Sequence, residues 1–191
     1  YDIELCLQVA AAYPLATVVS VHQGQPLISH VPMVLKDPSV PIFWGHMDRN
    51  NPQVQSLEGS LTIVFHGPNT YISPAVYNNS KRLPTWNYVK VEMKGQGRVL
   101  DENELRQSLH SLSKHMEGQE GSPLSYGDSR IPPLLPYIAG FTFEAEEMIG
   151  RFKLSQDKPD AERLNALQAL IEQPKQVDAD LLRRLCHSVS Q

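Results

Sequence analysis

The feature that constrains this chain most is an alternating segment in its middle, Tyr88–Leu100. Val89, Val91 and Met93 alternate there with charged side chains, so one face of the segment is apolar and the other is polar. A period of two residues is that of a β-strand and differs from that of a helix. The segment therefore predicts a half-buried strand with one dry and one wet face.

Short apolar segments with strand character recur along the chain and are separated by proline and glycine. Proline accounts for 15 of the 191 residues, about 8% against an average of about 5%, and long helical patterns are few. Many short strands joined by proline and glycine turns favour a closed or partly closed barrel. The additional predicted strands are Leu15–Val21, Leu27–Leu35, Val40–His46, Leu61–Phe65 and Ile138–Met148.

Other segments have helical spacing. The strongest is Asp101–Met116, in which Leu105 and Leu109 lie on one apolar stripe and Asp101 can cap the first turn. A long connection rich in glycine, proline and serine, Gly118–Pro136, follows it. The remaining predicted helices are Ile3–Ala12 at the start and a C-terminal pair, Ala161–Ile171 and Asp178–Val189, around a proline break.

The composition fits a globular protein and excludes several classes. Hydrophobic residues make up 41% and charged residues 20% of the chain, and 17 Lys+Arg against 21 Asp+Glu give a net charge of −4. This balance argues against a protein that coats nucleic acid, and no apolar run reaches the roughly 18 residues of a membrane span. Two distant cysteines, Cys6 and Cys186, with no basic and apolar leader at the start, indicate a protein of the reduced cytoplasm.

One segment has the composition of an anion site. Arg49 is followed by Asn51 and Pro52, which are favoured residues at the cap and the first position of a helix. Free N–H groups at a helix N-terminus and an arginine fork beside them can hold a phosphate. The alternative is a capped surface helix with a solvated arginine.

Three further segments carry aromatic or basic residues that suit a ligand site, and each has a structural alternative. Phe65–Pro74 predicts a strand, a turn at Gly67-Pro68 and an aromatic stretch; Leu83–Tyr88 opens the alternating strand; Arg151–Lys158 ends the last one. Core packing, a hairpin or a solvated strand end explains each segment taken alone. The seven histidines lack the spacing of a metal site, and no nucleotide-binding glycine loop or nucleophile elbow is present.

Taken together and in order, these segments resemble the PaiB-type FMN-binding negative transcriptional regulators. The motifs G-P-x-x-Y-I-S-P and P-T-W-N-Y are highly specific to that family, and the resemblance covers roughly the first 170 residues. The chain has Asp48-Arg49-Asn50-Asn51 where the family usually has A-R-A-N, and Asp157 where it usually has asparagine. The matching blocks are Ser29–Pro32, Gly45–Gln53, Phe65–Pro74, Leu83–Tyr88 and Phe152–Gln156.

The resemblance implies a mainly β fold of the α+β group: a split β-barrel of the pyridoxamine-phosphate-oxidase-like type, with peripheral helices and a short C-terminal helical pair. Residues 1–157 would form the FMN-binding domain, and residues 158–191 a helical extension packed on the barrel or on a dimer partner. Such barrels are usually homodimers with FMN in a cleft between subunits. The implied FMN contacts are Ser29, His30, Val31, His46, Arg49, Asn50, Asn51, Trp86, Asn87, Lys153, Ser155 and Gln156.

The function implied is that of an FMN-binding transcriptional regulator, with a flavin-dependent oxidoreductase as the alternative. No paired acid and base commits the sequence to turnover, because the flavin itself carries the chemistry. The histidines also leave a haem-binding relative open. Direct DNA binding has little support, since the segment from Arg151 onward carries seven basic and six acidic residues and so gives a weak footprint for phosphates.

Overall fold

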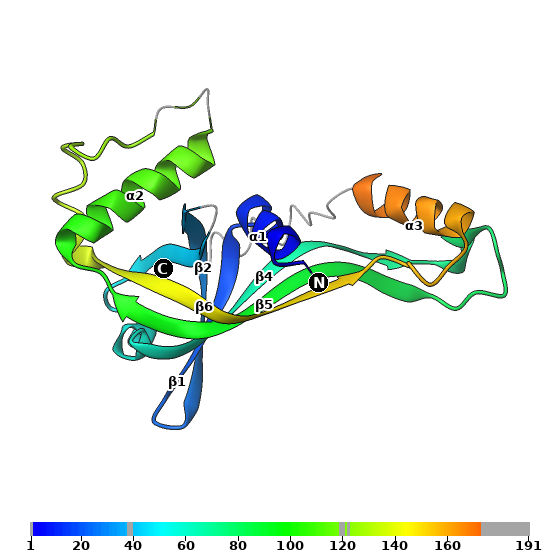
Figure 1. Ribbon diagram of the computed structural model, residues 1–191, viewed down its shortest axis with the longest axis horizontal. Helices are drawn as coiled ribbons and strands as arrows, with labels where there is room; N and C mark the ends of the chain where they lie inside the picture. The colour runs from blue at the N-terminus through cyan, green and yellow to red at the C-terminus, as the bar shows by residue number, and fades with distance from the viewer. Residues whose placement is uncertain (1, 38–39, 119–120, 122, 173–191) are drawn as a thin grey trace, which may run out of the picture. The chain divides into compact units, whose positions relative to one another are not determined.

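Six strands close into a barrel in the order β1-β2-β3-β6-β5-β4, as the ribbon in Figure 1 shows for this computed structural model. The structure describes residues 2–37, 40–118, 121 and 123–172. The short strands and their turns predicted a closed or partly closed barrel, and the structure has the closed form. The strands are β1 (Leu15–His22), β2 (Gln25–Asp37), β3 (Val40–Asp48), β4 (Gly59–Ile72), β5 (Thr85–Val99) and β6 (Ile138–Lys153).

The dry faces of the strands meet inside the barrel. Val91 and Met93 of the alternating strand are fully buried there, so the period-2 pattern did identify a half-buried strand. Phe43 and Phe65 pack with ring centroids 5.2 Å apart, and Phe143 lies 6.5 Å from Phe43. Burial of these large rings is the main source of the barrel's stability.

Two helices cover the barrel's openings and sides. Helix α1 (Ile3–Ala12) begins at Asp2, whose carboxylate accepts from Glu4 N, and buries Cys6 in the barrel core. Helix α2 (Glu102–Glu117) begins at a complete capping box formed by Asp101 and Glu104, and its leucine stripe packs around Trp44 in a second cluster. Both helices lie where the sequence predicted them, because cap and stripe are local signals. No helix in the described part of the chain is long and apolar enough to cross a membrane.

The predicted turn at Gly67-Pro68 is wrong, because β4 continues through both residues to Ile72. Within β4 the buried residues have odd numbers up to Gly67 and even numbers from Thr70 onward. The strand therefore changes the face that it turns toward the interior at the point where the turn was expected. A side chain at Gly67 would meet Val89 Cβ at 2.9 Å. The glycine therefore admits a neighbouring strand, and the Gly-Pro pair marks an irregularity within a strand.

The chain forms two compact units, which we call the barrel unit (Tyr1–Pro68 with Tyr88–Phe152) and the second unit (Asn69–Asn87 with Lys153–Gln191). In the second unit, helix α3 (Asp160–Glu172) and the short 3-10 helix η2 (Pro74–Tyr77) pack through a small apolar cluster. Helix α3 confirms the first helix of the predicted C-terminal pair. The second predicted helix, at 178–189, lies outside the described residues.

Candidate functional site

An edge of β2 that has no strand partner is the first feature of the barrel unit that can take a ligand. Strand β2 pairs with β1 from Gln25 to Pro32, but its pairing with β3 begins only at Met33. The segment after β3 runs beside this edge: Asn51 Nδ2 donates to Ser29 Oγ at 2.9 Å, and Gln53 Nε2 donates to Leu27 O at 3.1 Å. The structure thus brings together Ser29 and Asn51, which the sequence had placed in one site.

The helix that follows Asn51 is shorter than predicted. It is a 3-10 helix, η1, of five residues, Pro52–Ser56. Its first N–H groups are already bonded, since Gln53 N donates to Asn51 Oδ1 at 2.9 Å and Val54 N donates to Asn51 O at 3.0 Å. In the turn before the cap, Asn50 N donates to Asp48 Oδ1 at 2.7 Å. The expected cradle of free helix N–H groups is therefore wrong, because the cap and an aspartate turn use these donors locally.

Arg49 is held by backbone carbonyls of the segment that leads into β6. Its Nε donates to Pro136 O at 2.9 Å, and its Nη2 donates to Ile138 O at 2.6 Å and Leu135 O at 3.3 Å. The guanidinium therefore ties the end of β3 to the start of β6. Its Nη1 makes no such bond to a described residue, and this nitrogen remains available to an anion.

A row of polar side chains crosses the outer face of the barrel from β2 to β5. Thr17 Oγ1 lies 3.2 Å from His30 Nδ1 and 3.1 Å from His66 Nε2, so one hydroxyl links two imidazoles. Partial burial, together with the positive charges of His30 and Lys90, lowers the pKa of His66 below its usual value. Lys90 Nζ donates to Glu92 Oε2 at 3.0 Å. We call His30, Thr17, His66 and Lys90 the outer-face row.

The other predicted barrel positions have different surroundings. Val31 is buried in the barrel core, so it can meet a ligand only through its backbone. His46 is paired with Gly140 across β3 and β6, and burial lowers the pKa of its imidazole, which keeps the ring neutral at pH 7. Asn50 is exposed beside Arg49.

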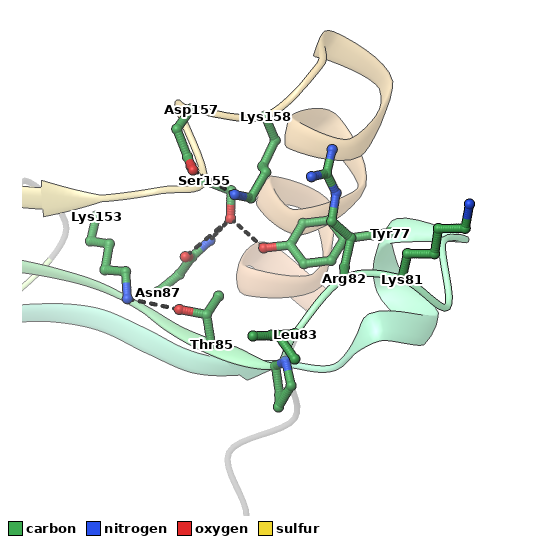
Figure 2. A pocket seen from close by; sticks show the side chains of 11 residues that line it. Tyr77, Lys81, Arg82, Leu83, Thr85, Asn87, Lys153, Ser155, Asp157 and Lys158 are labelled. Atoms are coloured by element: carbon green, nitrogen blue, oxygen red, sulfur yellow. Dashed lines mark hydrogen bonds and ion pairs between the residues drawn. The ribbon is translucent and has the colours of Figure 1, made fainter.

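The second unit contains a pocket built around a buried hydroxyl network (Figure 2). Ser155 Oγ lies 2.7 Å from Tyr77 Oη and accepts from Asn87 Nδ2 at 3.0 Å. All three side chains are at most 4% exposed. Ser155 has φ +60°, a left-handed conformation that is costly for a residue other than glycine. Its two hydrogen-bond partners hold it there.

Cationic side chains surround this network. Lys153 Nζ donates to Thr85 Oγ1 at 2.7 Å, and Arg82 Nε donates to Glu162 Oε2 at 2.7 Å. This ion pair lowers the pKa of the Glu162 carboxyl, and a hydrogen bond from Lys158 does the same for Asp157. The pocket has a volume of about 480 Å³, and its lining also includes Lys81, Leu83 and Pro84.

Trp86 and Asn87 lie on opposite faces of β5, because neighbouring strand residues alternate. Trp86 is 50% exposed, donates to Asn69 Oδ1 at 3.2 Å and packs edge-on to Tyr71. It therefore belongs to a different surface from the pocket. Gln156 Oε1 accepts from Leu154 N at 2.7 Å, and this bond stabilises the turn after β6.

The structure adds residues that the sequence analysis did not select. Thr17 and Lys90 complete the outer-face row, and Tyr77 completes the buried network. His66 and Tyr77 lie in or beside motif blocks that were recognised, so attention to polar residues in those blocks could have found them. Thr17 gave no signal of its own, since its partners come from two other strands.

Comparison with known structures defines the class of this protein. It resembles the FAD and heme binding protein from Mycobacterium smegmatis with a TM-score of 0.64 and 14% identity, covering 86% of this chain and 78% of the other. It resembles the flavocytochrome Anf3 from Azotobacter vinelandii with a TM-score of 0.62 and 15% identity, covering 86% and 73%. At these identities the likeness shows the fold, which is the split β-barrel.

Sequence comparison identifies the family within that class. The family described as "Putative FMN-binding domain" matches residues 1–147. The protein named "Protease synthase and sporulation protein PAI 2" from Bacillus subtilis is 32% identical over 162 residues, which are 81% of this chain and 77% of the relative. The chain therefore belongs to this family of PaiB-like FMN-binding proteins, and FMN is its cofactor.

The barrel unit offers what FMN requires. A phosphomonoester carries about −1.5 to −2 charges at pH 7, and the outer-face row supplies two imidazoles and an ammonium group. The edge of β2 that has no strand partner would offer backbone groups to the polar edge of a flat ring, beside the Ser29–Asn51 pair. When bound, FMN supplies the redox chemistry of the flavin ring, and the protein supplies binding, orientation and electrostatics.

Proposed function

We propose that this protein is a PaiB-type regulator that binds FMN on its barrel unit, at the interface of a homodimer. The observation that carries the proposal is the outer-face row, in which His30, Thr17, His66 and Lys90 come from four adjacent strands. Two imidazoles around one hydroxyl, with the ammonium group of Lys90 close enough to lower the pKa of His66, provide hydrogen-bond donors that suit a phosphate. The family relationship makes the phosphate of FMN its natural occupant.

Seven of the sequence-predicted contacts belong to this proposal. Arg49 offers Nη1 two residues before Asn51, whose side chain bonds Ser29 of β2. Val31 contributes backbone, and neutral His46 contributes a hydrogen-bonding ring. The remaining five, whose contact with FMN stays a prediction, lie in the second unit: Trp86, Asn87, Lys153, Ser155 and Gln156. The seven are Ser29, His30, Val31, His46, Arg49, Asn50 and Asn51.

The proposed homodimer rests on apolar side chains on the outer face of the β1–β2 hairpin. Leu15, Val21 and Ile28 are 58%, 64% and 63% exposed. They lie on the same face as the Thr17↔His30 pair of the hairpin, so a second copy covering them would also enclose the outer-face row. Exposed apolar patches around a ligand site are typical of protein interfaces.

The regulatory role is inferred from the Bacillus subtilis relative, whose name refers to protease synthase and sporulation. Helix α3, the described part of the C-terminal extension, has one basic residue, Arg163, among acidic ones. We therefore propose that the regulator acts through a protein partner and not through direct binding to DNA. A gel shift at two salt concentrations tests this, since salt-sensitive and sequence-dependent binding would assign the output to DNA. The free thiol of buried Cys6 supports a cytoplasmic location, which cell fractionation can check.

Titration of the apo-protein with FMN and with riboflavin tests the site. Arg49→Ala should weaken FMN binding by about 1.5–3 kcal/mol, the range for a hydrogen bond to a charged group, and should leave riboflavin binding nearly unchanged. His66→Gln should act in the same direction, and Arg163→Gln on α3 serves as the control. Equal FMN affinity in wild type, Arg49→Ala and His66→Gln would remove the phosphate from this site.

Two further measurements separate the regulator from its alternatives. Sedimentation of the FMN-loaded protein should give a dimer, and Ile28→Lys should shift it to a monomer with weaker FMN binding. Adding NADH or NADPH to the FMN-loaded protein tests the oxidoreductase reading. Flavin bleaching at a catalytic rate would contradict a purely regulatory role, whereas an unchanged flavin spectrum supports it.

A further inference from the structure

The pocket of the second unit has a charge that its own residues do not balance. Lys81, Arg82, Lys153 and Lys158 line it, and among the described lining residues only Asp157 is acidic. Glu162 neutralises Arg82 from α3, so two positive charges remain in excess. We propose that this pocket is a second ligand site, which binds the phosphate group of a small molecule.

The free donors of the pocket favour an anion. The ammonium group of Lys153 has three N–H donors and bonds one neutral hydroxyl, Thr85 Oγ1. Lys81, whose side chain extends away from the Ser155 network at the rim of the pocket (Figure 2), has no carboxylate partner among the residues that the structure describes. An excess of two positive charges matches the roughly −2 charge of a phosphate monoester near neutral pH.

The size and floor of the pocket indicate an organic phosphate. Its volume of about 480 Å³ is within the range of about 300–1,000 Å³ for small-molecule sites and exceeds what an inorganic ion fills. The floor is rigid, because the Tyr77–Ser155–Asn87 network is buried and bonded internally. Leu83 and Pro84 also line the pocket and add apolar surface to it.

The left-handed backbone at Ser155 places the residues that follow β6 on this pocket. The strand ends at Lys153, and Asp157 and Lys158 line the same cavity four and five residues later. Ser155 is held in this conformation by side chains of two other segments, Tyr77 and Asn87. Backbone strain that is fixed by buried hydrogen bonds is a recurrent property of ligand sites.

Asp157 provides an unusually direct test. Asp157 pairs with Lys158 at the lining of the pocket. Asp157→Asn removes a negative charge from the lining and frees an ammonium group. The substitution should therefore increase the affinity for a phosphate, which is a gain that damage to the fold cannot produce.

The experiment measures binding of phenyl phosphate, FMN and riboflavin to the full chain by calorimetry. For phenyl phosphate, Lys153→Gln should lower the affinity about fivefold or more, and Asp157→Asn should raise it about threefold or more, as expected for one charge in a partly solvated site. Arg163→Gln, which changes an exposed cation of the same unit, is the control and should have no effect.

Binding of FMN distinguishes whether the pocket takes a separate organic phosphate or the phosphate of FMN. If the pocket takes a separate molecule, phenyl phosphate binds to the FMN-loaded protein and Lys153→Gln leaves FMN affinity unchanged. If FMN displaces phenyl phosphate and Lys153→Gln weakens the binding of FMN but not of riboflavin, the pocket takes the phosphate of FMN itself, and the proposal of a second site is overturned. Equal phenyl phosphate affinity in wild type, Lys153→Gln and Asp157→Asn would overturn the proposal.

Discussion

The barrel unit and the second unit are stabilised by different interactions. The barrel encloses a large apolar cluster with four phenylalanine rings that are at most 1% exposed. The second unit has a small cluster centred on Ile72, Tyr77 and Ala166 and relies on the Ser155 network and the Arg82–Glu162 ion pair. Apolar burial depends little on pH, whereas charged and hydrogen-bonded contacts depend on the ionisation of a few groups.

The same contrast holds for the two candidate sites. In the barrel unit the polar groups largely satisfy one another: Thr17 links His30 and His66, and Arg49 bonds three carbonyls. In the second unit the lysines around the pocket keep unused donors. A preformed set of bonded polar groups favours selective recognition of one cofactor, while unbalanced charge favours a class of ligands that share an anionic group.

The largest expected effect is in the barrel core. Phe143→Ala should lower the free energy of unfolding by about 3–5 kcal/mol, because it removes a fully buried ring from close packing. Hydrogen exchange followed by mass spectrometry should show the loss of protection across the barrel strands. If Phe143→Ala lowers the free energy of unfolding by less than about 1 kcal/mol, the barrel does not depend on this apolar cluster, and the proposed contrast with the second unit is wrong.

A smaller effect is expected in the second unit. Ser155→Ala should cost about 1–3 kcal/mol, since it leaves the buried Tyr77 hydroxyl and Asn87 amide without their partner. Tyr77→Phe should cost about 0.5–1.5 kcal/mol, because Ser155 keeps its bond to Asn87. Exchange should rise in residues 69–87 and not in the barrel core, and a rise spread over the whole chain would contradict separate stabilisation of the two units.

The smallest expected effect is a local loss of stability at low pH. The folded pKa of Glu162 lies below its ordinary value, mainly through the hydrogen bond from Arg82. Its contribution is therefore present above the unfolded pKa and is lost as the pH falls through the folded pKa. In the barrel unit, the bond from Arg98 lowers the pKa of Glu104 to about 2, so that contact persists further into acid. As the pH falls below the ordinary pKa of a glutamate, protection should fall first in residues 69–87, and Glu162→Gln should abolish this difference.

Elements with a local signal were predictable from the sequence. Strict alternation predicted strand β5, and a leucine stripe with a capping residue predicted α2. A short apolar pattern with helical spacing before a proline predicted α1. The blocks that resemble the family also lie in the segments that carry the candidate sites. These features depend on residues within one turn or one strand, so the sequence contains their cause directly.

The tertiary structure alone decided how those segments meet. Gly67-Pro68 reads as a turn, but closure of the barrel draws the pair into β4, where the glycine admits Val89. Arg49 reads as a phosphate ligand, but most of its donors are used by carbonyls near residue 136.

The two sites have the same origin in long-range contacts. Thr17 joins histidines of two other strands, and Ser155 joins residues from two segments about 70 to 80 positions earlier. The amino-acid sequence determined the strands, the helices and the cofactor family of this protein. Which polar groups are satisfied and which remain free for a ligand was settled only by folding, because hydrogen-bond partners far apart in the chain are selected by barrel closure and not by local propensity.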